Sequence, residues 1–173
     1  IDYDGPVGLR YPRGEAEGVR LPAEPEAIEI GVGEVLREGK RAALVGYGSG
    51  VGKALEAAEI LAARGLDVTV ADARFAKPID AALMAQLAAE HELLVTVEEG
   101  VIAGGFGTAV WEVLNEGHLP TPRMIRVGVP DAYITHGKPA LLHEEIGFTG
   151  PAIAERVTVA LGLELEPVEP SGS

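Results

Sequence analysis

The sequence predicts an α/β fold in which a parallel β-sheet is buried between helices, and three observations predict it. Short apolar runs that lack polar alternation recur along the chain, as expected for strands that are covered on both faces. Helical segments of roughly 10–15 residues separate these runs, which is the spacing of βαβ units. Glycine-rich turns follow two of the runs, where a strand would pass directly into a helix.

The regular part of the chain is expected to begin at residue 28. Residues 28–35 alternate with period two, which predicts a strand, and a polar turn signal follows at 37–40. Further strands are expected at 42–45, 68–71, 93–97 and 124–127. Helices are expected at 51–64, 80–90, 107–115, 139–146 and 151–161.

Residues with defined roles at helix ends mark the helix boundaries. Gly65 is expected to close the first helix, and Asp80 is placed as the N-cap of the second. Pro139 and Pro151 stand near the first position of the last two helices, where proline is tolerated best.

Both ends of the sequence differ from this regular pattern. Residues 7–11 resemble a short strand that Pro12 and Gly14 end, and the Glu/Pro-rich stretch at 21–26 is typical of an interdomain linker. The polar, proline-containing tail at 164–173 is expected to be disordered. The first residue is Ile1 rather than Met, so we expect a piece of a longer chain or a processed product.

Composition excludes several classes of function. With 27 acidic and 14 basic residues the formal net charge is −13, which disfavours binding to nucleic acid or to an anionic membrane surface. The absence of cysteine excludes disulfides, zinc–thiolate sites, iron–sulfur clusters and thiol nucleophiles. No apolar run approaches the roughly 18 residues of a membrane span, and we expect no secretory signal.

The glycine-rich stretch at 46–53 lies between an expected strand and an expected helix, where backbone N–H groups favour an anion. Its spacing matches neither the dinucleotide-binding fingerprint nor the P-loop, and Ser49 lacks the flanking glycines of a nucleophile elbow. We therefore interpret it as a tight strand-to-helix turn.

The stretch at 98–107 begins with two acids and also opens a helix. Glu98 and Glu99 would point in opposite directions, so they are not a pair that shares one proton. Gly104 and Gly105 would permit close approach of another surface. An interface loop, a small-molecule site and a plain turn with exposed acids all remain open.

Other polar residues give weaker signals. Four residues follow expected strands and should share one edge of the sheet, where ligands of α/β proteins usually bind: Ser49, Asp72, Glu98 and Asp131. The four histidines show no metal-ligand spacing: His91, His118, His136 and His143. We expect His136 to be a solvated loop residue.

The N-terminal segment is locally basic in an acidic chain, with Arg10, Arg13 and Arg20. The guanidinium fork suits a phosphate monoester, because two N–H donors match two phosphate oxygens. A bend at Pro12 and Gly14 would hold Arg13 in one place, although exposed charges on an edge strand would also explain the three arginines.

Five stretches together resemble the 1-deoxy-D-xylulose-5-phosphate synthase family, over residues 1 to about 162. They are Asp4-Gly5-Pro6 with Arg10-Tyr11-Pro12-Arg13-Gly14, the run at 72–80, Val97-Glu98-Glu99-Gly100-Val101, the glycine-rich run at 104–107, and Gly128-Val129-Pro130-Asp131. The Arg-Tyr-Pro-Arg-Gly element distinguishes that family from transketolase and from the β chains of 2-oxo-acid dehydrogenases.

The resemblance implies a three-layer α/β/α sandwich with a mostly parallel five-stranded sheet and one antiparallel strand, for which 28–35 is the natural candidate. It implies that residues 1–20 are the end of a pyrimidine-binding domain and that residues 21–27 are a linker. Residues 28–162 would then form the transketolase C-terminal-like domain, and residues 163–173 a disordered tail. The intact enzyme would be a cytoplasmic homodimer that uses thiamine diphosphate and Mg²⁺ to condense pyruvate, with loss of CO2, and D-glyceraldehyde 3-phosphate. That reaction feeds isoprenoid, thiamine and pyridoxal synthesis.

By the same resemblance Arg13 matches the arginine that binds the phosphate of the acceptor, and Arg10 is a second candidate. The family's catalytic residues and its ligands for thiamine diphosphate and Mg²⁺ lie upstream, so we expect this chain alone to be inactive and to bind neither. A fragment of a 2-oxo-acid dehydrogenase or ferredoxin oxidoreductase, and a free-standing α/β module that binds a nucleotide at 46–52, remain the alternatives.

Overall fold

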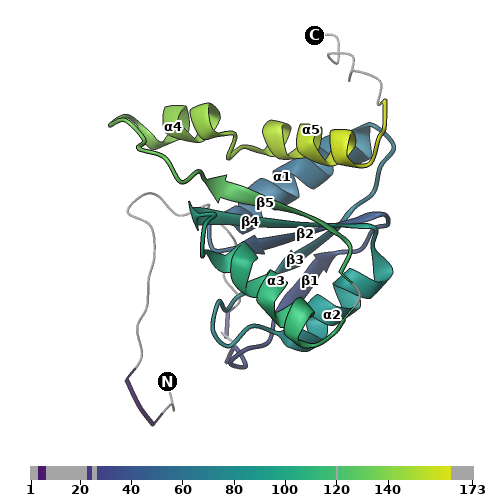
Figure 1. The fold of residues 1–173 in the computed structure, drawn as a ribbon, viewed down its shortest axis with the longest axis vertical. Helices are drawn as coiled ribbons and strands as arrows, with labels where there is room; N and C mark the ends of the chain where they lie inside the picture. Colours follow the sequence, from purple (N-terminus) through teal and green to yellow (C-terminus); the bar gives the residue numbers. More distant parts are fainter. Residues whose placement is uncertain (1–3, 7–22, 25–26, 120, 165–173) are drawn as a thin grey trace.

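Five strands form a single sheet in the order β1-β3-β2-β4-β5, and helices cover both of its faces (Figure 1). The structure, a computed structural model, describes residues 4–6, 23–24, 27–119 and 121–164. The strands are β1 (Glu34–Arg37), β2 (Ala42–Tyr47), β3 (Thr69–Asp72), β4 (Leu93–Val101) and β5 (Arg123–Val129). The helices are α1 (Gly50–Ala63), α2 (Ala81–Glu90), α3 (Phe106–Glu116), α4 (Pro139–Ile146) and α5 (Gly150–Ala160).

The sheet is parallel except at one edge. β3, β2, β4 and β5 pair in parallel, whereas β1 runs antiparallel to β3. This confirms the predicted mixed five-stranded sheet, and the expected central strands and all five helices lie within a few residues of their predicted positions.

The prediction of a strand over 28–35 was wrong in its extent, because β1 spans Glu34–Arg37. Gly31 has a positive φ of 80°, and the backbone N–H of Gly33 donates to a carboxylate oxygen of Asp80 at 2.9 Å. Ile28 and Ile30, the apolar residues of the alternating pattern, are more than half exposed. The segment before β1 is therefore fastened by the loop that precedes α2 and does not pair with β3 at these residues.

Alternate residues along the buried strands build two cores. Leu44, Val70 and Val95 face α1 and α5 together with Phe148. Val45, Ala71 and Leu94 face the opposite layer, which α2 and α3 form. Because both sheet faces are covered, the central strands are apolar without alternation, as the sequence predicted.

The caps predicted at two helices are present. Asp80 accepts a hydrogen bond from the backbone N–H of Leu83 at 2.9 Å as the N-cap of α2. Gly65 follows the C-cap of α1 with a φ of 80°, the left-handed conformation that ends helices. The expected disordered tail falls on 163–173, of which 165–173 lie outside the described residues.

No helix in the described part of the chain is long and apolar enough to cross a membrane.

Candidate functional site at the carboxyl edge of the sheet

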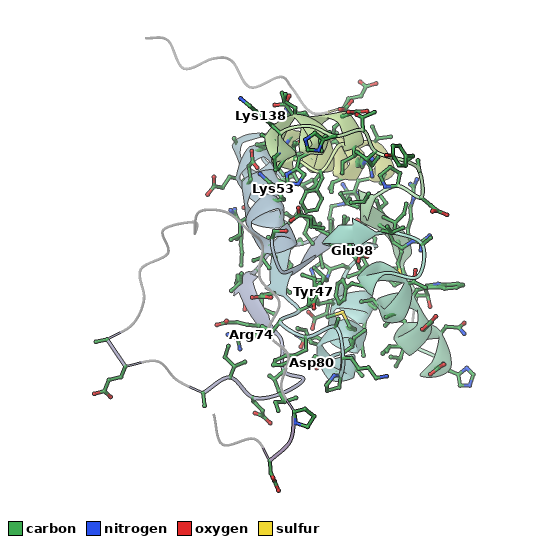
Figure 2. The ribbon with its side chains drawn as sticks, turned by 90° about the vertical axis from the view of Figure 1, so that its left-hand side faces the viewer. Tyr47, Lys53, Arg74, Asp80, Glu98 and Lys138 are labelled. Atoms are coloured by element: carbon green, nitrogen blue, oxygen red, sulfur yellow. The ribbon has the colours of Figure 1, made fainter. Side chains whose placement is uncertain are left out.

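The ends of the parallel strands bring polar residues from distant segments to one edge, onto which Figure 2 looks. Gly46 at the end of β2 pairs with Asp72 at the end of β3, and Tyr47 pairs with Glu98 of β4. The prediction that Ser49, Asp72 and Glu98 share this edge is confirmed. Asp131 follows the end of β5 and is exposed.

Glu98 is the buried acid of this edge, with 5% of its surface exposed. Its two carboxylate oxygens accept hydrogen bonds from the backbone N–H groups of Phe106 and Gly107, both at 2.8 Å. These donors belong to the first turn of α3, whose N-cap residue is Gly105 and has no side chain to accept them. Glu98 thus supplies from the neighbouring strand the cap that the helix lacks.

The burial of Glu98 corrects one of the alternatives left open by the sequence, in which residues 98–107 are a plain turn with two exposed acids. Only Glu99 is exposed, and the two carboxylates bind different groups, which confirms that they point apart. Gly105 is required where it stands, because a Cβ there would lie 2.5 Å from a carboxylate oxygen of Glu98. The glycine-rich run at 104–107 therefore serves a contact within the domain.

Glu99 joins three segments. Its carboxylate accepts from the hydroxyl of Ser49 at 2.5 Å and lies 3.2 Å from Nε2 of His143 on α4. The acid stands between the hydroxyl and the imidazole, whereas a serine nucleophile requires the imidazole beside the hydroxyl. The arrangement fastens α4 to the sheet and does not activate Ser49.

Close packing also explains the glycines of the turn at 46–53. A Cβ on Gly50 would lie 2.0 Å from the carbonyl oxygen of Val97, and one on Gly46 would lie 2.5 Å from the Cα of Val51. The first turn of α1 therefore sits directly on strands β2 and β4. This is the tight strand-to-helix turn that the sequence predicted.

The loop that follows β3 carries a third polar group. Arg74 has a positive φ of 54°, its backbone N–H donates to Asp72 at 2.8 Å, and its guanidinium pairs with Glu34 of β1. The loop thereby links the antiparallel edge strand to the end of β3.

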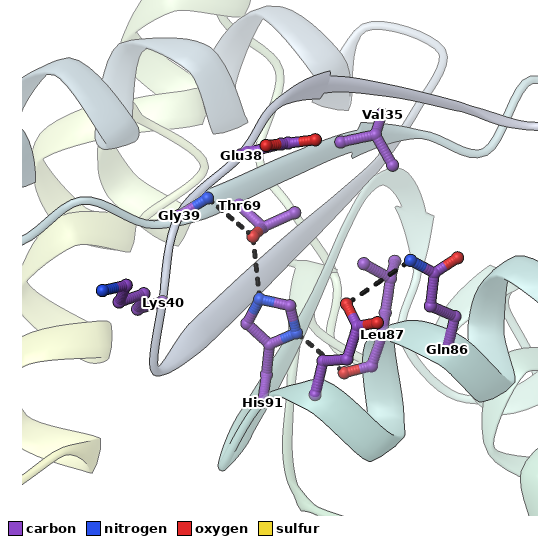
Figure 3. A pocket seen from close by; sticks show the side chains of 9 residues that line it. Val35, Glu38, Gly39, Lys40, Thr69, Gln86, Leu87 and His91 are labelled. Carbon is purple, nitrogen blue, oxygen red and sulfur yellow. Dashed lines mark hydrogen bonds between the residues drawn. The ribbon is translucent and has the colours of Figure 1, made fainter.

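At the opposite edge, a hollow of about 380 Å³ is lined mainly by residues of α2 and of the β1–β2 connection (Figure 3). His91, at its base, is buried and contacts the hydroxyl oxygen of Thr69 at 2.7 Å through Nε2 and the carbonyl oxygen of Leu87 at 2.9 Å through Nδ1. A carbonyl only accepts, so Nδ1 carries a proton, and the hydroxyl oxygen of Thr69 also accepts from the backbone N–H of Gly39 at 3.0 Å. Both ring nitrogens of His91 therefore have partners within the domain, so His91 is a structural histidine.

Near this hollow, Arg41 and Glu92 form an exposed ion pair with 2.5 Å between Nε and Oε1. The hydrogen bond from Arg41 holds the pKa of Glu92 below its ordinary value. The contribution of this ion pair to the stability of the domain is therefore present at neutral pH, and it is lost as the pH falls through the lowered pKa of Glu92.

Among the described residues, no group of three or more histidine, aspartate or glutamate side chains could hold a metal ion. His136 is exposed in its loop, as expected. Arg10 and Arg13 lie outside the described residues, so their assignment stays a prediction. Sequence reasoning missed the burial of Glu98 and the contact of His143 with Glu99, although a glycine at the N-cap of α3 was a signal for the first.

A family comparison agrees with this architecture. The sequence model described as the transketolase, C-terminal domain, matches residues 31–153. The chain belongs to the transketolase C-terminal domain family. The match covers the sheet, α1 to α4 and the start of α5.

Curated relatives of this transketolase C-terminal domain are longer than the chain. The 1-deoxy-D-xylulose-5-phosphate synthase 1 of Geobacter metallireducens is 46% identical over 157 residues, which cover 91% of this chain and 25% of that protein. The 1-deoxy-D-xylulose-5-phosphate synthase of Thermosynechococcus vestitus is 46% identical over 165 residues, 94% of this chain and 26% of that protein. The chain thus spans about a quarter of the length of the curated relatives that it matches.

Solved structures are similar in the same domain. A chain described as a split gene transketolase, inactive beta4 tetramer, aligns with a TM-score of 0.72 and 40% identity over 79% of this chain and 44% of that chain. A transketolase mutant from Pichia stipitis aligns with a TM-score of 0.54 and 19% identity over 81% of this chain and 20% of that chain, which supports the fold alone.

Proposed function

We propose that this chain is the C-terminal part of a 1-deoxy-D-xylulose-5-phosphate synthase, a transferase that condenses pyruvate with D-glyceraldehyde 3-phosphate and releases CO2. The observation that carries the proposal is the 46% identity to two such synthases over more than nine tenths of this chain. The Arg-Tyr-Pro-Arg-Gly element at 10–14 adds support, because it is the element by which we separate this family from its relatives. By the same proposal the enzyme is a cytoplasmic homodimer that serves isoprenoid, thiamine and pyridoxal synthesis.

The described residues do not fit the cofactor that such a synthase uses. The N-terminus of α3 is closed to a diphosphate, because the carboxylate of Glu98 already accepts its N–H groups and would repel a second anion. No described cluster suits Mg²⁺. We therefore place the sites for thiamine diphosphate and Mg²⁺ on upstream polypeptide, and we derive no step of the reaction from this domain.

Within this chain, we propose that Arg13 binds the phosphate of the aldehyde acceptor, with Arg10 as a second candidate. An arginine fork matches a phosphate monoester in charge and in geometry. The domain itself would act by completing the assembly. The related chain described as an inactive beta4 tetramer supports our expectation that this chain alone is inactive.

A chimaera tests the function. In the synthase of Geobacter metallireducens, the C-terminal region that aligns with this chain is replaced by residues 1–173. The chimaera is assayed for the condensation of pyruvate with D-glyceraldehyde 3-phosphate in the presence of thiamine diphosphate and Mg²⁺. We expect product from the chimaera and none from the 173-residue chain alone. A chimaera that assembles as the parent does but forms no product would contradict the proposal.

A further inference from the structure

Three apolar side chains at the carboxyl edge of the sheet are open to solvent, and we call them the carboxyl-edge patch. Val101 is 46% exposed, Tyr133 97% and Leu141 60%. Val101 ends β4, Tyr133 lies in the connection from β5 to α4, and Leu141 lies in α4. None of the residues of α4 is buried, so this helix gives little of its surface to the core.

Contacts within the domain bring the patch to one edge. Val101 pairs with Val129, the last residue of β5, four residues before Tyr133. α4, which carries Leu141, lies at the same edge, because Nε2 of His143 is 3.2 Å from a carboxylate oxygen of Glu99 of β4. In Figure 1 the β5–α4 connection projects beyond the arrowheads of β4 and β5. Nearly complete exposure of a tyrosine, with a leucine and a valine at the same edge, is typical of a surface that a protein partner covers.

The chain also enters the domain at this edge. Glu34, the first residue of β1, pairs with Asp72, the last residue of β3, and Gly33 is hydrogen-bonded to Asp80 in the loop beyond β3. The chain therefore reaches β1 at the carboxyl ends of the parallel strands. The two curated relatives carry about three quarters of their length outside the part that this chain matches.

We infer that the carboxyl-edge patch is the docking surface for the upstream polypeptide of the synthase, which would meet it with an apolar surface. This inference rests on the proposed function, which supplies that polypeptide. The entry point of the chain favours this occupant over a second copy of the same domain, because a tethered partner at the same edge has a high effective concentration. Tyrosine is a frequent anchor of such contacts, since its ring buries a large apolar area while its hydroxyl keeps a polar partner.

Hydroxyl-radical footprinting tests the inference with the 173-residue chain and with the chimaera. We expect the oxidation rate of Tyr133 to fall at least about tenfold in the chimaera, as for a residue in the dry centre of an interface. Val159, which is 71% exposed on α5, should be oxidised equally in both. Met84, which is fully buried, reports whether each protein is folded.

A pair of matched variants adds a second test. Leu141→Glu places a charge in the patch and should raise the oxidation rate of Tyr133 in the chimaera at least tenfold, toward its rate in the 173-residue chain, whereas Val159→Glu should leave the protection of Tyr133 unchanged. Equal oxidation of Tyr133 in both proteins would overturn the inference. Protection of Tyr133 in the 173-residue chain that grows with its concentration would assign the patch to a second copy and would also overturn it. Product formation is measured separately, so an active chimaera with an unprotected Tyr133 refutes the docking surface alone, and an inactive, protected one refutes the function alone.

Discussion

Replacing Glu98 by glutamine should destabilise the domain more than any other isosteric change of an acid at this edge. The carboxylate accepts two backbone N–H groups of α3 at 2.8 Å, and the residue is 5% exposed. Glutamine keeps one acceptor oxygen but turns an NH2 group toward the second N–H donor. An unpaired buried donor costs about 1–3 kcal/mol, and loss of a negative charge at a helix N-terminus adds about 0.3–1 kcal/mol. We therefore expect a loss of about 2 kcal/mol in the free energy of unfolding.

Urea unfolding of the 173-residue chain, followed by circular dichroism, measures this loss. With a denaturant slope of about 2 kcal/mol per molar for a domain of this size, the midpoint should fall by about 1 M at an unchanged slope. Glu99→Gln is the matched control, since its side chain is 40% exposed and an exposed pair contributes at most about 1 kcal/mol. If the two variants unfold at the same urea concentration, the capping role of Glu98 is wrong.

Three further predictions concern other parts of the domain. Gly50→Ala should cost about 2 kcal/mol or more in thermal or urea unfolding, because the added Cβ would lie 2.0 Å from a carbonyl oxygen of β4; an unchanged midpoint would show that α1 can move away from the sheet. Thr69→Val should cost about 2 kcal/mol, since it removes the hydroxyl partner of His91 and leaves buried polar atoms unpaired; a neutral effect would mean that water replaces the hydroxyl. The stability advantage of the parent over Arg41→Gln should be present at pH 7 and vanish as the pH falls through the lowered pKa of Glu92; an advantage that persists in acid would contradict the ion pair as its cause.

Local signals in the sequence predicted most of the fold. Asp80 and Gly65 marked helix ends correctly because capping depends on residues within one turn of the end. The strand at 28–35 was misplaced because period-two alternation records side-chain polarity only. It does not record that Gly33 is held by the carboxylate of Asp80, a contact across 47 residues of sequence.

The same limit applies to the carboxyl edge. Strand ends place Ser49 and Glu98 at one edge, which is a property of parallel topology that sequence can predict. That Glu98 is buried depends on where α3 starts relative to β4, and that Glu99 contacts His143 depends on how α4 packs. Both contacts depend on tertiary packing, and residue spacing in the sequence does not predict them.

The most direct test of the account is the kinetic effect of Arg13→Ala in the chimaera, with Arg20→Ala as the control in the same basic segment. Loss of a charge-paired contact to phosphate is worth about 2–5 kcal/mol, so kcat/KM for D-glyceraldehyde 3-phosphate should fall at least about 30-fold through a higher KM. The KM for pyruvate should stay unchanged in both variants. An unchanged KM for the phosphorylated aldehyde, or a raised KM for pyruvate instead, would contradict the role of this chain in binding the acceptor.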